Sequence, residues 1–192
     1  MEVFLNMMKT DLGDVKRWLL EAVAKLPKKY SSVLIFDAVT GLRPEEACKS
    51  VSLITELAEA GRLGDYFNEQ LQMLEHFRHP QLFLRGCKNC YISFVPSRVC
   101  ELVLREKPKA KGYAVRWALH KSGLSGEIMG LRKLYATTLR DKGIPREVVD
   151  LLEGRIGQSI FVRHYYKPDL LKQTREKVLK AIQPLVNEVL AA

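Results

Sequence analysis

Arginine and tyrosine residues are concentrated in one stretch, residues 129–166, which reads MGLRKLYATTLRDKGIPREVVDLLEGRIGQSIFVRHYY. It carries an arginine-bearing helical pattern, a Gly-Arg turn and a pair of tyrosines. A guanidinium can bind two non-bridging oxygens of a phosphodiester and stabilise the charge that gathers there under attack. A tyrosine phenol, with a reference pKa of about 10, needs nearby positive charge to act as a nucleophile near neutral pH. These residue types therefore predict chemistry on a phosphodiester.

A further arginine at a candidate site, Arg43, lies in TGLRPEEACKS, residues 40–50. Pro44 and the two glutamates that follow it are typical of the first turn of a helix, so we expect Arg43 at a rigid helix entrance. Glu46, three residues further on, is placed to hydrogen-bond back toward Arg43. The alternative interpretation is a solvent-exposed arginine at a helix cap.

A β-hairpin is predicted from the aromatic and β-branched runs LFLRG and CYISFV on either side of Lys88-Asn89. We expect Lys88 at the tip of this hairpin, where a long flexible amine can reach a ligand. The alternative is a solvated turn lysine.

Cysteine and histidine residues near the hairpin form HxxH followed by CxxC, made of His76, His79, Cys87 and Cys90. This set could bind zinc. The favoured interpretation is that the two cysteines flank a tight turn, so no metal site is predicted. A disulfide across the hairpin is a further alternative.

Helical spacing of apolar residues dominates the rest of the chain. For residues 30–40 a strand is the alternative, because the run is almost wholly apolar. Residues 69–79 also have helical spacing. The predicted helices cover residues 11–26, 30–40, 44–60, 97–105, 113–121, 126–142, 144–152, 159–166 and 169–192.

Composition and charge restrict the class of protein. The chain has 192 residues, of which 47% are hydrophobic, which predicts a folded chain with one domain. Its net charge of +9 favours a polyanionic partner, with nucleic acid ahead of a membrane. No apolar run approaches the roughly 20 residues of a membrane span, and MEVFLNMMKT lacks the features of a secretory signal. We therefore expect a cytoplasmic protein.

The densest basic patch begins in the linker EKPKAKGY and continues into the following helix. Its side chains are candidate contacts to a phosphate backbone, and a solvated loop is the alternative. The patch comprises Lys107, Lys109, Lys111, Arg116 and Lys121.

The order of these motifs resembles the tyrosine recombinases, the lambda-integrase-like family, and is most like the integrases of archaeal viruses and plasmids. TGLRxxE is followed far downstream by LRxxxAT, a Gly-plus-basic turn and a tyrosine, and the resemblance covers residues 30–170. It implies a mainly α fold with a small antiparallel β-hairpin or sheet (α+β), the catalytic domain of that family. It also implies a recombinase that cleaves and rejoins double-stranded DNA through a covalent 3′-phosphotyrosine, to integrate or excise a mobile element.

The resemblance also implies partners, location and organisation. A homotetramer on an attachment site, associated with the nucleoid, is expected, with no cofactor, because the phosphotyrosine conserves the bond energy. Residues 1–29 would form a leading helix, residues 30–168 the catalytic core, and residues 169–192 a C-terminal helix. That last helix would fold back or be exchanged between protomers. The N-terminal DNA-clamping domain of the family is expected to be absent.

Family roles carry over onto matching positions of this sequence. Glu46 would support the first arginine, and Tyr166 is the alternative to the nucleophile. The catalytic residues implied are Arg43, Lys88, Arg132, Arg155 and Tyr165.

Two positions depart from the family pattern. Arg155 stands where His or Trp is usual, but a guanidinium can still hydrogen-bond a phosphate oxygen. Met129, three residues before Arg132, stands where His, Lys or Tyr is usual, and a thioether carries no catalytic proton.

A second hypothesis is therefore a catalytically weakened DNA-binding accessory protein or relic of an integrase. A basic RNA-binding module is a weaker third, because no aromatic-studded binding strand is evident.

Overall fold

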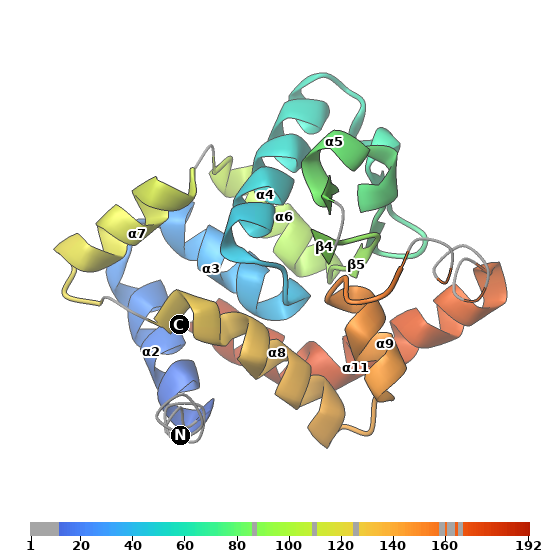
Figure 1. The fold of residues 1–192 in the computed structure, drawn as a ribbon. Coiled ribbons are helices and arrows are strands. Elements are labelled where there is room, and N and C mark those ends of the chain that lie inside the picture. The colour runs from blue at the N-terminus through green and yellow to red at the C-terminus, as the bar shows by residue number, and fades with distance from the viewer. Residues whose placement is uncertain are drawn as a thin grey trace.

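A computed structural model describes residues 12–85, 88–108, 111–124, 127–157, 160, 164 and 167–192, and it leaves the side chains of Arg85, Lys88 and Glu127 out (Figure 1). The fold is mainly α-helical, with a three-stranded antiparallel sheet and a separate two-stranded hairpin. The helices are α2 (Leu12–Lys25), α3 (Lys28–Thr40), α4 (Pro44–Glu59), α5 (Pro80–Phe83), α6 (Ser97–Glu106), α7 (Gly112–Lys121), α8 (Gly130–Asp141), α9 (Arg146–Leu152) and α11 (Pro168–Ala191).

The centre of the molecule is α3, whose residues from Ser31 to Thr40 are all buried. Helices α2, α4, α6, α8 and α11 all contact it. In Figure 1, α4, α6 and the strands lie on one side of α3, and α2, α8 and α11 lie on the other. The near-continuous apolar run at residues 30–40, for which both a helix and a strand were possible, is thus a helix surrounded by other helices. Gly41 ends this helix in a left-handed conformation (φ 63°).

Residues 69–79 do not form the helix that their apolar spacing would allow. The segment holds strand β2 (Met73–Leu74) and the 3-10 helix η2 (His76–Arg78) instead. A turn precedes β2, in which Gln72 has a φ of 45° and donates its backbone N–H to the Glu69 carbonyl at 3.1 Å. Pairing of β2 with both β1 (Phe67–Asn68) and β5 (Ser93–Phe94) overrides the helical spacing, because Met73 and Leu74 are buried between these strands.

The predicted hairpin is present, but it is shorter than expected. Strand β3 (Leu84–Arg85) pairs with β4 (Lys88–Asn89), and Arg85 opposes Lys88 across the connection. Lys88 therefore begins the second strand and does not occupy the tip as predicted. The later part of CYISFV leaves this hairpin, and β5 joins the three-stranded sheet.

Two predicted helices, those expected from residues 126 and 144, begin two or more residues later than expected. Helix α8 begins at Gly130 after the 3-10 helix η3 (Glu127–Met129), and α9 begins at Arg146 after Pro145 as its N-cap. The other short 3-10 helix is η1 (Leu63–Asp65). Most of the predicted helix at 159–166 lies outside the described residues.

Helix α11 packs against its own chain, on α2, α3 and α8. Its apolar stripe is buried as predicted, and includes Leu171, Val178, Ile182, Leu185 and Val189. Buried side chains from α2 to α11 belong to a continuous hydrophobic core. Within the described part of the chain, no helix has the length and apolar character that crossing a bilayer requires.

A buried polar network ties the three-stranded sheet to α4. His76 Nδ1 lies 2.7 Å from the Tyr66 hydroxyl, which in turn lies 2.8 Å from Ser50 Oγ, and His76 Nε2 lies 2.9 Å from Ser93 Oγ. Burial, with a smaller contribution from His79, lowers the pKa of His76 to about 3. His76 is therefore a neutral structural residue at physiological pH.

This network predicts a loss of stability in mild acid. Between the ordinary pKa of histidine, about 6.5, and the lowered value in the fold, the unfolded chain binds the extra proton. The free energy of unfolding should thus fall as the pH drops from 7 toward 4, by up to about 1.4 kcal/mol per pH unit from this group. Urea denaturation over this pH range should give a shallower slope for His76→Gln than for the wild type. His120→Gln, which alters an exposed histidine, should keep the wild-type slope; equal slopes in all three proteins would contradict the prediction.

Candidate functional site

Arg43 occupies the corner between α3 and α4. It is the N-cap of α4 in an extended conformation, directly before Pro44. Its backbone N–H donates to Glu46 Oε2 at 3.1 Å, and its Nη1 donates to Glu46 Oε1 at 2.8 Å. The predicted bond from Glu46 is confirmed. Glu46 is fully buried while 26% of the Arg43 side chain is exposed, so a buried carboxylate anchors an arginine that lies at the surface.

Arg132 lies in the first turn of α8 and joins two other parts of the chain. Its Nη1 donates to the Gly41 carbonyl at 2.9 Å, and its Nη2 donates to the Glu153 carbonyl at 2.5 Å. Its Nε forms an ion pair with Glu153 Oε1 at 3.1 Å. A guanidinium has more N–H donors than these contacts use, so Arg132 can still bind an anion.

Tyr135 fixes the distance between the Arg43 corner and α8. A Cβ atom placed on Gly41 would lie 2.1 Å from Cδ1 of Tyr135, so the tyrosine ring packs directly on the glycine backbone. Tyr135 is fully buried. It lies one helical turn after Arg132, so the same face of α8 supplies both the packing contact and the guanidinium.

Glu153 connects the second and third arginines. Its carboxylate pairs with Arg132 and, through Oε2, with Nη2 of Arg155 at 2.8 Å. Only 1% of the Glu153 side chain is exposed, and burial raises its pKa while Arg132 and Arg155 oppose that rise. Glu153 was not singled out from the sequence. The only available signal was an acidic residue directly before the Gly-Arg pair.

Arg155 is the most exposed arginine of the site, with 56% of its side chain accessible. Its backbone N–H donates to the Asp150 carbonyl at 2.8 Å, which closes the turn after α9. Its Nη1 also lies 3.4 Å from Asp150 Oδ1. Arg155 is thus positioned by its turn and by two carboxylates.

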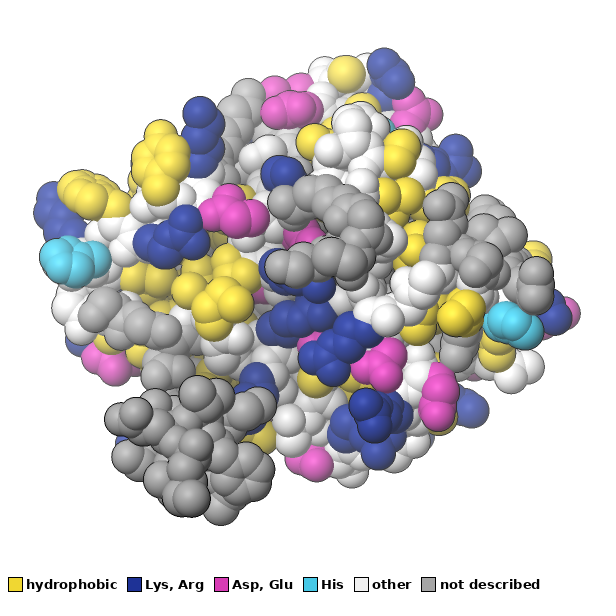
Figure 2. Space-filling view, in the orientation of Figure 1, with side chains coloured by type: hydrophobic (Ala, Val, Ile, Leu, Met, Phe, Trp, Pro, Cys, Tyr) yellow, Lys and Arg dark blue, Asp and Glu magenta, His cyan; other side chains and the backbone are white. Residues whose placement is uncertain are grey.

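We call Arg43, Arg132 and Arg155 the arginine cluster. Burial lowers the pKa of Arg132, Glu153 opposes that shift, and Arg43 and Arg155 add to it. The like charges are therefore close enough to disfavour one another, which an incoming anion would relieve. Figure 2 shows Lys and Arg side chains gathered in the middle of the face where α8, α9 and β4 meet in Figure 1.

A buried carboxyl group lies behind the cluster. Asp37, on the last turns of α3, has no hydrogen-bond partner for its Oδ1 atom. Burial raises the pKa of Asp37 well above its usual value, and Arg132 opposes that shift. Asp37 was also not singled out from the sequence, where it appears as one polar residue within an apolar run.

Strand β4 is packed against the turn that carries Glu153 and Arg155. Gly154 has a φ of 65°, and a Cβ atom placed on it would lie 2.2 Å from the carbonyl oxygen of Asn89. Cys90 Sγ donates to the Leu152 carbonyl at 3.8 Å, and the Tyr91 hydroxyl donates to the Ile156 carbonyl at 3.4 Å. The backbone of Lys88 therefore begins a strand beside the arginine cluster.

Three other predicted site residues are not among those that the structure describes. Tyr165, its alternative Tyr166, and Lys109 of the basic patch lie outside the described residues. Met129 ends η3, and it is 63% exposed.

The basic patch is partly paired with acidic side chains. Arg116 Nη2 lies 2.9 Å from Glu45 Oε1, and Lys107 Nζ lies 3.6 Å from Glu59 Oε1. Lys111 is the exposed N-cap of α7, and Lys121 Nζ lies 5.1 Å from the centroid of the Trp117 ring. Glu45 links the patch to α4, two residues after Arg43.

The alternative zinc set is not assembled among the residues described. Both ring nitrogens of His76 are engaged with Tyr66 and Ser93, so neither is free to bind a metal. Cys90 is a buried free thiol whose pKa burial raises to about 12. Searched over the described part of the chain, no group of three or more His, Cys, Asp or Glu side chains could hold a metal ion.

Comparison of the chain with protein-family models, with curated proteins and with solved structures finds no match.

Removal of the charge on Glu153 should destabilise the site. Glu153→Gln would leave Arg132 largely buried without its carboxylate, which should lower the free energy of unfolding by about 2–4 kcal/mol. Asp150→Asn is the matched control, because Asp150 is partly exposed and pairs with Arg155 at 3.4 Å, and it should lose under about 1 kcal/mol. Chemical denaturation at pH 7 measures both. Equal losses would mean that Glu153 is not the residue that holds the cluster together.

The close approach at Gly154 gives a second prediction. Gly154→Ala should lower the free energy of unfolding by about 3 kcal/mol or more, because it combines a left-handed φ with a clash against the Asn89 carbonyl. Gly143→Ala is the control, since Gly143 also has a positive φ (77°) but open space around it, and it should lose only about 1 kcal/mol. A thermal melt of each variant tests this, and similar shifts would show that the approach of β4 is not tight.

Proposed function

We propose that this chain is a tyrosine-type site-specific DNA recombinase that cleaves and rejoins strands through a 3′-phosphotyrosine. The observation that carries the proposal is the arginine cluster. Arg43 and Arg132 are far apart in the chain, yet both are fixed to the corner after α3, and Glu153 joins Arg155 to Arg132. Guanidinium groups held this way suit the charged oxygens of a phosphodiester in its transition state.

The reaction would be a transesterification. The phenolic oxygen of Tyr165 would bond to phosphorus, and the bond from phosphorus to the 5′ oxygen would break. The phenol proton would leave as the attack proceeds, and the 5′ oxygen would take a proton as it departs. Attack by the 5′-hydroxyl of a second strand would then release the tyrosine and rejoin the DNA.

Within this proposal the arginine cluster binds the non-bridging oxygens, and Lys88 is the candidate donor to the 5′ oxygen. The packing of β4 on the Gly154 turn supports that role, because it holds the start of the lysine's strand beside Arg155 and Arg132. The mainly helical fold with small antiparallel sheets is consistent with the family's α+β architecture. Double-stranded DNA as the substrate and a homotetramer on the attachment site belong to the same proposal.

A second candidate is a DNA-binding accessory protein that no longer cleaves. The observation in its favour is Met129, which is 63% exposed at the end of η3 and offers no proton at a position where the family uses one. This candidate keeps the phosphate-binding role of the arginine cluster without the covalent step.

Covalent capture on DNA separates the two candidates. Because the target sequence is unknown, the substrate should be a library of randomised duplexes that carry a nick, so that cleavage releases a short fragment and traps the adduct. We expect a denaturant-resistant protein–DNA adduct from the wild type, enriched for one sequence, and none from Tyr165→Phe. An adduct that survives in Tyr165→Phe but disappears in Tyr166→Phe would move the nucleophile by one residue. No adduct from the folded wild type would favour the accessory protein.

Lys88 offers a separate test on the captured sequence. Lys88→Ala should slow strand cleavage by about 100-fold, since a proton donor acts in the transition state, while the Kd for DNA stays nearly unchanged. Lys142→Ala, which removes an exposed lysine elsewhere, should alter neither value. A large loss of affinity in Lys88→Ala would make that lysine an ordinary phosphate contact.

A further inference from the structure

Helix α7 presents two large aromatic side chains to solvent. Tyr113 is 67% exposed and Trp117 is 60% exposed, and they lie four residues apart on the same face of the helix. Lys121, four residues further on, holds its Nζ 5.1 Å from the centroid of the Trp117 ring. Figure 2 shows hydrophobic and basic side chains interleaved over α7. Exposed aromatics with flanking cations are typical of surfaces that bind a partner.

The charge of this segment has a single sign. From Lys111 to Lys121 the sequence reads KGYAVRWALHK, with four basic or histidine residues and no aspartate or glutamate. An anionic partner is therefore favoured over a neutral or basic one. An ordinary apolar protein interface would leave these cations desolvated without partners.

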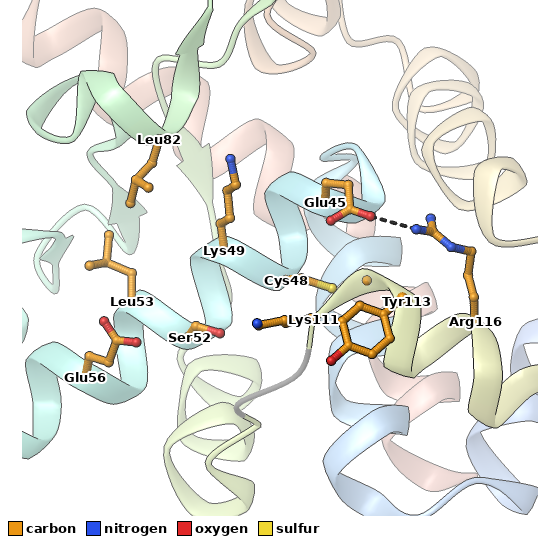
Figure 3. Close-up of a pocket in the computed structure, with 11 residues that line it drawn as sticks. Glu45, Cys48, Lys49, Ser52, Leu53, Glu56, Leu82, Lys111, Tyr113 and Arg116 are labelled. Atoms are coloured by element: carbon orange, nitrogen blue, oxygen red, sulfur yellow. Dashed lines mark hydrogen bonds and ion pairs between the residues drawn. The ribbon is translucent and has the colours of Figure 1, made fainter.

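A cavity of about 420 Å³ opens between α4 and the start of α7. Its wall includes the apolar side chains of Leu53 and Leu82, and Tyr113 stands at its edge (Figure 3). Lys111 extends from the start of α7 on the side of the cavity that faces Ser52. The volume is in the range of small-molecule sites, about 300–1,000 Å³. The charged lining consists of three cations and two carboxylates, Glu45 and Glu56, and Glu45 is paired with Arg116. Apolar side chains beside this excess of cations suit a planar ring that carries a phosphate.

The start of α7 lies against the first turn of α4. A Cβ atom on Gly112 would lie 2.2 Å from Glu45 Oε1, and the same carboxylate pairs with Arg116 at 2.9 Å. Glu45 belongs to the first helical turn after Arg43, so one turn of α4 positions both the arginine cluster and α7. A nucleic acid bound at the arginine cluster could thus extend along α4 to α7.

We propose that α7 and the adjoining cavity bind unpaired bases of single-stranded nucleic acid, with Tyr113 and Trp117 as stacking surfaces and Lys111 and Lys121 as phosphate contacts. A duplex is excluded from this role because its base faces are covered by their neighbours, whereas a single strand offers both π-faces and phosphates. The site goes beyond strand cleavage and does not require it.

Trp117 provides a direct reporter, because the chain has only two tryptophans. Trp18→Phe removes the other one from α2, where its Nε1 has no hydrogen-bond partner to lose. In this background, oligo-dT should quench Trp117 fluorescence at concentrations where a duplex of equal charge does not. Oligo-rU in place of oligo-dT tells whether the sugar matters, and quenching by either strand supports the proposal. Equal quenching by the duplex, or none by either single strand, would overturn it.

Substitutions then test the stacking with a dye-labelled oligo-dT and fluorescence anisotropy. Tyr113→Leu and Trp117→Leu should each weaken binding by about tenfold, because they keep apolar bulk but remove the π-face. Leu170→Ala, an exposed apolar residue on α11, is the control and should leave binding unchanged. Lys111→Gln should reduce the dependence of log K on log salt by about one ion.

Outcomes of these assays distinguish this site from the proposed recombinase. Wild-type affinity in both aromatic variants would overturn the stacking site even if the duplex library yields a covalent adduct. Loss of single-strand binding in those variants, with no adduct from the wild type, would support the stacking site and contradict the recombinase proposal.

Discussion

The contact between the corner after α3 and the first turns of α8 sets the geometry of this molecule. Arg132 donates to the Gly41 carbonyl, and the Tyr135 ring lies so close to Gly41 that no side chain fits between them. Arg43, the N-cap of α4, follows Gly41 by two residues, so the direction of α4 follows from the same contact. The buried helix α3 supports the corner from within the core. One packing contact therefore determines where two of the three clustered arginines lie.

Features governed by neighbouring residues could be predicted from the sequence. Gly41 ends α3, Pro44 opens α4, and Glu46 bonds back to Arg43, because each depends on backbone geometry within a few positions. The same holds for the apolar stripe of α11. The segment TGLRPEE therefore predicts the corner at Arg43 and the bond from Glu46, whereas the burial of Glu46 depends on packing by the rest of the fold.

Features that depend on distant segments could not be predicted in this way. Residues 69–79 have helical spacing, yet Met73 pairs with Phe94 in a strand, a contact twenty-one residues away along the chain. Glu153 pairs with Arg132 although the two residues belong to different elements, and the residues next to Glu153 in the sequence do not indicate that its carboxylate is buried. The approach of Asn89 to Gly154 likewise appears only when the hairpin and the α9 turn meet in space. The residue types in the sequence thus indicate the candidate chemistry, but only tertiary packing determines which carboxylates pair with the arginines.

Glu153 and Asp150 have a consequence for selectivity. Both carboxylates already contact Arg155, so an anion that approaches the cluster competes with ligands built into the protein. A weakly held monoanion gains little by displacing them, whereas a group fixed on a long polyanion enters at high effective concentration and is better able to do so. Under the proposed function, the internal pairs would act as a threshold that keeps small free anions from saturating the arginines. The same carboxylates would pair with Arg155 again once a bound phosphate leaves the site.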